Sequence, residues 1–115
     1  MRIEGQMNRQ DMKGRTKEFA KRIIKLCRSL PNNREGRLIG NQLFRFGTSV
    51  AANYRAACRS RSKAEFIARL GIVEEEADES LFWLEIVAEM EIMSKNLLEV
   101  LMKENNDCCY NRFFN

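Results

Sequence analysis

A single proline, at position 31, interrupts the 115 residues of this chain. Proline and glycine break helices most strongly, and the sequence contains only six glycines. A few long helices are therefore favoured over many short elements joined by turns. The length suits one domain, and a hydrophobic fraction of 44% with a charged fraction of 31% is typical of a globular protein.

Apolar residues recur at helical spacing in four segments. The first segment carries Phe19, Ile23 and Leu26 at i, i+4 and i+7, and Pro31 ends it. Ser62 and Glu65 form a capping-box pattern before the third segment, and Ser94 is a suitable N-cap for the fourth. These signals predict an all-α fold, an antiparallel up-and-down four-helix bundle with helices at about residues 16–29, 37–59, 63–93 and 95–103. We expect residues 1–14 to form a flexible arm, residues 15–104 the bundle domain and residues 105–115 a divergent tail.

The third predicted helix has two apolar faces. Its main stripe includes Val73, Ala77 and Leu84, and a second stripe lies about a quarter turn or more away, at Ile72, Trp83, Ile86 and Met90. A small bundle rarely needs two apolar faces on one helix. The second stripe is therefore expected either to contact another subunit or to pack on the first helix or the tail.

Charge is distributed unevenly along the chain. Residues 1–69 contain 17 lysines and arginines against 5 acids, whereas residues 70–115 contain 3 against 11. The two halves can neutralise each other by packing together. Alternatively, part of the basic surface is left free for an acidic partner.

The best functional candidate is a run of basic residues, with Arg45, Arg55 and Arg59 on the outer face of the second helix and Arg61 and Lys63 in the turn that follows. Basic side chains at helical spacing can contact successive phosphates of structured RNA or DNA, with little dependence on sequence. The alternative is a protein-interaction or scaffold module, in which these residues pair with the acids of the third helix, within the hairpin or between subunits.

The sequence offers little for catalysis. It has no histidine, no paired-cysteine zinc motif and no phosphate-binding glycine motif. Glu76 falls beside the apolar stripe of the third helix, and we expect it to join Gln42 and Asn53 in a structural polar network. A magnesium-dependent hydrolase built on the acids of residues 74–79 is the least favoured alternative. We therefore expect no enzyme activity, no cofactor and no metal.

No run of about 20 apolar residues is present, so we expect no membrane span. The N-terminal residues are polar and lack the apolar core of a secretory signal. Both features predict a cytoplasmic protein.

Several linked motifs resemble a known family. The segment QLFRFGTSVAANYRAACRSRSKAEFIARLGIVEEEADESLFWLE is similar to the shared core of the four-helix-bundle proteins encoded by intervening sequences in bacterial 23S ribosomal RNA genes. The matching pieces are residues 42–43, 48–55, 62–66, 76–79 and 83–85, and the resemblance covers about residues 16–98.

The resemblance implies an antiparallel bundle that assembles into a ring, typically a homopentamer. It also implies similarity to the accessory protein of diversity-generating retroelements, which binds nucleic acid and works with a reverse transcriptase. It carries over no catalytic residue. Arg45, Arg55 and Arg59 match positions where such proteins present basic residues, and Asn53 and Glu76 match polar positions of the hairpin interior.

The sequence departs from the family pattern in two places. Phe46 stands where the family usually has a small residue, most often serine. After Leu98 the chain no longer matches the longer fourth helix of the family, and a shortened helix would expose apolar surface on the first and third helices.

Overall fold

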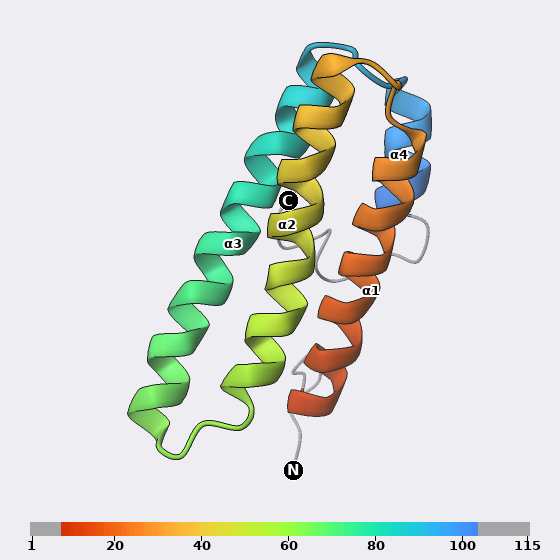
Figure 1. Cartoon of the computed structure of the whole chain (residues 1–115). Helices are drawn as coiled ribbons and strands as arrows, with labels where there is room; N and C mark the ends of the chain where they lie inside the picture. The colour runs from red at the N-terminus through yellow and green to blue at the C-terminus, as the bar shows by residue number, and fades with distance from the viewer. Residues whose placement is uncertain (1–7, 104–115) are drawn as a thin grey trace.

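The computed structural model describes residues 8–103, which form four helices joined by short connections. They are α1 (Arg9–Ser29), α2 (Arg34–Ala57), α3 (Lys63–Glu89) and α4 (Lys95–Lys103). Figure 1 shows consecutive helices running in opposite directions, with α2 between α3 and α1 and the short α4 against α1. The expected all-α four-helix fold is confirmed.

Each helix begins at a side chain that caps its free amides. The side-chain oxygen of the residue before the helix accepts a hydrogen bond from the backbone N–H three residues later. These capping residues are Asn8, Asn33, Ser62 and Ser94. The carboxylate of Glu65 also accepts from the backbone N–H of Arg61, at 2.6 Å, so the predicted capping pattern before α3 fixes its start.

The helix bounds differ from the expectation at three places. α1 begins seven residues before the predicted start at Thr16, because Asn8 caps it and Asp11 lies in its positively polarised first turn. Part of the segment expected to be a flexible arm is therefore helical, while residues 1–7 and the expected tail lie outside the described residues. α2 spans residues 34–57 rather than 37–59.

α3 ends at Glu89, before the predicted Met93. Glu91 adopts a left-handed backbone with φ of 54°. The N–H groups of Glu91 and Ile92 then turn back to the carbonyls of Ala88 and Val87. This pattern is the Schellman motif, which closes a helix by satisfying its last carbonyl groups. The helix therefore stops without a glycine or proline.

The core follows the predicted apolar stripes. Ile23, Leu43 and Leu84 are fully buried and bring α1, α2 and α3 together. α4 adds Leu98 and Met102 to the same cluster from the side of α1. Phe46, which stands where the family usually has a small residue, is half-buried.

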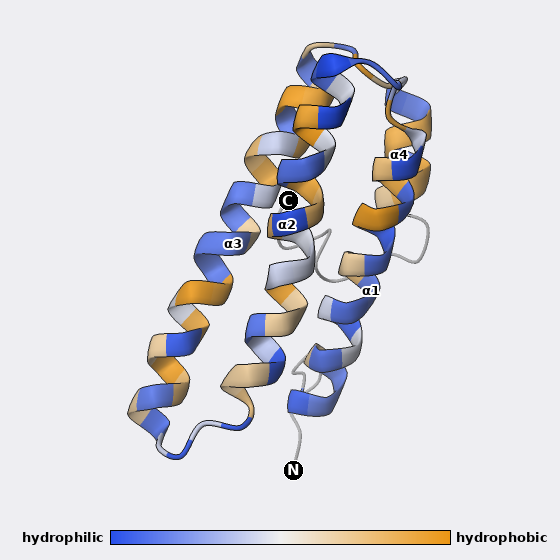
Figure 2. Cartoon of the chain, viewed as in Figure 1, coloured by the Kyte–Doolittle hydropathy of each residue, from blue (hydrophilic) through white to orange (hydrophobic). Residues whose placement is uncertain are grey.

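The second apolar stripe of α3 is largely uncovered in a single chain. Ile72 and Met90 are exposed, as is Phe82 of the same helix, whereas Trp83 and Ile86 are half-buried against the core. Figure 2 shows hydrophobic residues interspersed with hydrophilic ones along α3. Its main packing partner among the described helices is α2, which leaves the outer face of α3 open.

Among the helices at residues 9–103, none is long and apolar enough to cross a membrane.

Candidate nucleic-acid interface

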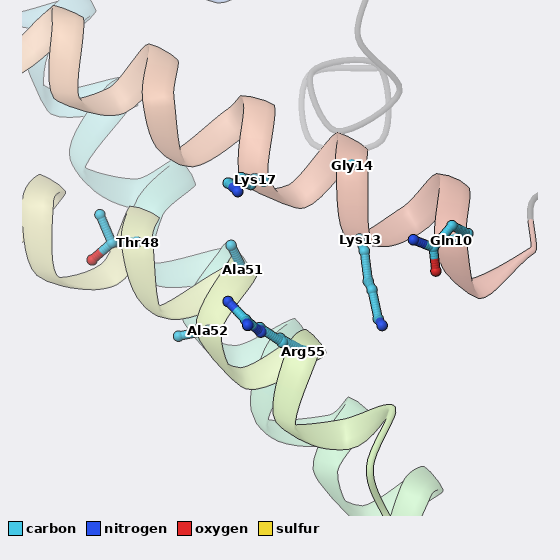
Figure 3. Close-up of a pocket in the computed structure, with 8 residues that line it drawn as sticks. All are labelled: Gln10, Lys13, Gly14, Lys17, Thr48, Ala51, Ala52 and Arg55. Carbon is cyan, nitrogen blue, oxygen red and sulfur yellow. The ribbon is translucent and has the colours of Figure 1, made fainter.

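A hollow of about 570 Å³ lies between the N-terminal half of α1 and the C-terminal half of α2. Its small residues Gly14, Ala51 and Ala52 leave the space, and Lys13, Lys17 and Arg55 supply positive charge. Gln10 and Thr48 complete the lining. In Figure 3 the side chain of Lys13 extends from α1 beside α2, and that of Arg55 lies over α2 toward Ala51. We call this hollow the basic groove.

Helical spacing places these side chains on facing surfaces. Lys13 and Lys17 are four residues apart on α1, and Thr48 and Arg55 are seven apart on α2. The hydroxyl of Thr48 is within hydrogen-bonding distance of the carbonyl of Phe44, at 2.6 Å, so its proton is directed at the backbone. The free donors of the groove are therefore its charged side chains and the amide of Gln10.

None of the described residues that line the basic groove carries a carboxylate. Ion pairs in the described helices join Lys21 to Glu18 and Arg69 to Glu65, each within one helix. Lys17 and Arg55 thus have no acidic partner in the part of the chain that the structure describes. Two cations on neighbouring helices without a counter-ion favour binding of an anion from outside.

The five predicted basic residues fall into two groups. Arg45, Arg55 and Arg59 are exposed on the outer face of α2, and the Arg45 guanidinium lies 5.2 Å from the ring centre of Phe46. Of the three, Arg55 alone lines the basic groove.

Arg61 and Lys63 belong to a separate hollow of about 500 Å³ at the end of the bundle. Arg9 of α1 joins them there, with its guanidinium 4.2 Å from the ring centre of Phe66. The alternative in which these arginines pair with acids of α3 within the hairpin is not formed among residues 8–103, where the carboxylate of Glu65 accepts from the backbone N–H of Arg61.

Sequence reasoning missed the contribution of α1. Arg9, Lys13 and Lys17 reach the interface because the helix begins at Arg9, whereas most of this segment was expected to be an arm. The signal that would have found them is the capping pattern of Asn8 with Asp11, which marks a helix start before the apolar stripe begins.

The predicted polar residues lie at the edge of the α2–α3 contact. Gln42, Asn53 and Glu76 are each half-buried, and no hydrogen bond joins their side chains within the described chain. The Asn53 amide donates to the carbonyl of Ser49 at 2.9 Å, one turn earlier on α2. The helix backbone therefore accepts one hydrogen bond from this amide, and the expected network is not formed among the described residues.

Two other titratable groups are held neutral. Burial raises the pKa of the Cys27 thiol to about 11. The pKa of Tyr54 is raised to about 12, mainly by burial and to a smaller extent by the neighbouring Cys58. Neither group is activated as a nucleophile or base, because both pKa values move away from neutrality. The described residues also contain no group of three or more side chains that could hold a metal ion.

Comparison with known proteins agrees with the fold. A family model described as 23S rRNA-intervening sequence protein matches residues 9–110. The crystal structure of a protein of unknown function from the S23 ribosomal protein family, from Bacteroides thetaiotaomicron, is similar with a TM-score of 0.77 and 33% sequence identity. The match covers 93% of this chain and 94% of that one. None of the curated proteins compared with the chain matches it. Because the family model spans most of the sequence, the chain belongs to the family of 23S rRNA-intervening sequence proteins.

Proposed function

We propose that this protein binds structured RNA or DNA through the basic face of α1 and α2, without catalysing a reaction, in the cytoplasm. The observation that carries the proposal is the basic groove, where Lys17 and Arg55 face a hollow that no acidic residue among positions 8–103 lines. Small side chains in the groove allow a nucleic-acid backbone to come close to both helices.

Phosphate is the anion that suits this surface. A lysine acts as a point charge toward a phosphate oxygen, and an arginine donates two parallel hydrogen bonds. Arg45 and Arg59 continue the positive charge along the same helix, and Arg61 and Lys63 extend it to the end of the bundle. Such a row favours a polyanion over a single small anion.

We further propose that the protein works as a homo-oligomer, a pentamer by its family resemblance. The exposed apolar face of α3, at Ile72, Phe82 and Met90, supports this part of the proposal. Burying these side chains against a second copy removes apolar surface from water, which stabilises an assembly by about 25 cal/mol per Å². Each added copy would bring another basic groove and raise avidity.

The test measures fluorescence anisotropy of a labelled hairpin RNA and a labelled DNA duplex over a salt series. We expect binding that weakens steeply with salt. The double variant Lys17→Ala/Arg55→Ala should bind more weakly, with the slope of log K against log salt reduced by about 1–2. The matched control is Arg69→Ala/Lys95→Ala, which removes the same charge from α3 and α4 and should bind like the parent.

The outcomes separate the proposal from a scaffold role. If the parent protein forms an oligomer but binds neither probe at low salt, the nucleic-acid proposal is wrong and the basic residues serve assembly. The variant Arg55→Glu/Arg59→Glu would then disrupt the oligomer, since it reverses charges that pair with acids of a neighbouring copy. Equal weakening by both double variants would show that net charge, and not the basic groove, controls binding.

A further inference from the structure

A second hollow continues the seam between α1 and α2 toward the other end of the two helices. It has a volume of about 470 Å³ and is lined by Arg28 and Pro31 on one side and by Arg37, Gly40 and Phe44 on the other. The thiol of Cys27 donates to the Gly40 carbonyl at 3.5 Å beneath it. In the part of the chain that the structure describes, no acidic residue lines this hollow.

The ring of Phe44 is the unusual feature of this hollow, because 49% of its surface is exposed. A phenylalanine side chain has no polar atom, so leaving half of it in water loses about half of the stabilisation that full burial would provide. Other large exposed hydrophobic residues of the described chain lie on α3 and α4, apart from Leu38. Leu38 is six residues earlier on α2 and so about 120° around the helix. Phe44 is therefore a single aromatic ring on a basic face, unlike the contiguous apolar patch of a protein interface.

One stripe of α2 connects this ring to the basic groove. Arg37, Phe44, Thr48, Ala51 and Arg55 follow the spacing of residues that share a helix face. Phe44 thus lies between two arginines, and about 10 Å of helix separates it from the position of Ala51. A polyanion lying along the seam would pass over the ring on its way from Arg37 to Arg55.

We propose that this seam binds unpaired nucleotides, with one base stacked on Phe44 and the flanking phosphates held by Arg28, Arg37 and the basic groove. The inference rests on the proposed nucleic-acid function and specifies its ligand. In a duplex both faces of each base are already stacked, so the ring has no base face to contact. In a single strand or a loop, each base offers a face to an aromatic side chain, whatever its sequence.

The experiment compares a short labelled single-stranded RNA with the same strand annealed to its complement, using the full-length protein. The parent should prefer the single strand. Phe44→Ala should lower single-strand affinity about tenfold and leave duplex affinity unchanged. Phe44→Tyr keeps the ring and should restore single-strand binding. Leu38→Ala, which removes an exposed side chain from another face of α2, should bind like the parent.

A direct readout comes from a variant carrying Phe44→Trp and Trp83→Phe, whose one tryptophan reports on the stacked base. Addition of the single strand should quench its fluorescence, and the duplex should not. If Phe44→Ala binds the single strand as well as the parent does, the stacking inference is wrong while the basic groove retains its proposed role. If the parent binds neither probe, the proposed function fails together with this inference. A change in oligomer mass caused by Phe44→Ala would assign the ring to contact between copies, which also overturns the inference.

Discussion

Gly47 of α2 lies directly against Ile23 of α1. A Cβ atom at Gly47 would come within 2.7 Å of Ile23 Cγ2 and 2.8 Å of Cγ1, closer than carbon atoms pack. Ile23 is fully buried and branched at Cβ, so it has little freedom to turn aside within its helix. The close approach of α1 and α2 therefore depends on glycine, which has no side chain, at position 47. The same two helices present Lys17 and Arg55, so this contact also sets the basic groove.

Replacing Gly47 with alanine should lower the free energy of unfolding by about 1–3 kcal/mol, because the new methyl group overpacks the contact with Ile23. The intrinsic preference of alanine for helices, about 1 kcal/mol, offsets part of this loss. Urea unfolding followed by circular dichroism measures the change. The control is Gly71→Ala on the exposed side of α3, where a Cβ meets nothing within 4 Å. This control should raise stability by about 0.5–1 kcal/mol, and a similar gain in Gly47→Ala would contradict the argument.

Replacing Glu91 with glycine should stabilise the protein. Its φ of 54° costs a residue with a side chain about 1–2 kcal/mol relative to glycine, which adopts this conformation freely. Glu91→Gly should therefore raise the unfolding free energy by about 1 kcal/mol. Glu89→Gly, two residues earlier within α3, should lower it by a similar amount because glycine is unfavourable in a helix. The prediction fails if the two substitutions change stability in the same direction.

We expect the buried guanidinium of Arg22 to reduce stability. Its side chain is 1% exposed, its Nη1 lies 3.5 Å from the carbonyl of Met102, and its Nε and Nη2 have no hydrogen-bond partner in the described structure. Leaving buried charged donors unsatisfied costs about 1–3 kcal/mol or more. Arg22→Met has similar length and no polar hydrogen, and should raise the thermal midpoint. Lys21→Met, an exposed neighbour, should change stability by less than about 0.5 kcal/mol. A lower midpoint for Arg22→Met would show that the guanidinium has a partner outside residues 8–103.

Alkaline pH should lower the stability of the protein by ionising Tyr54 and Cys27. The pKa of Tyr54 is raised from 10.0 to about 12, and that of Cys27 from 9.0 to about 11. Both folded-state values lie above the unfolded ones, so the native state holds more protons and stability falls as pH rises through this range. The contribution of Tyr54 is complete below pH 10 and is lost toward pH 12. Thermal midpoints measured from about pH 8 to pH 12 should therefore decline, and less steeply in Tyr54→Phe, which cannot ionise. Parallel curves for the two proteins would refute the role of Tyr54.

The parts of this structure that were predictable are those that depend on local sequence. The stripes around Ile23 and Leu84, and the caps before α3 and α4, are set by neighbouring residues and agree with the structure. The start of α1 at Arg9 was not predicted, because the apolar stripe that indicates this helix begins only at Phe19. The basic groove could not be read from spacing, because it depends on which face of α1 meets α2.

Substitutions on the exposed face of α3 can test whether this face contacts another copy of the protein. Ile72 and Met90 are 44% and 66% exposed and stand about five helical turns apart on one face. If that face contacts another copy, Ile72→Ser with Met90→Ser removes apolar contact and should reduce the mass measured by light scattering to that of one chain. Helix content should stay the same, since neither side chain belongs to the core of the single chain. Leu38→Ser, which changes a residue of α2 that is 54% exposed, should keep the parental mass. A parent protein that is already a single chain, or a double variant that keeps the full mass, would show that α3 does not carry the assembly.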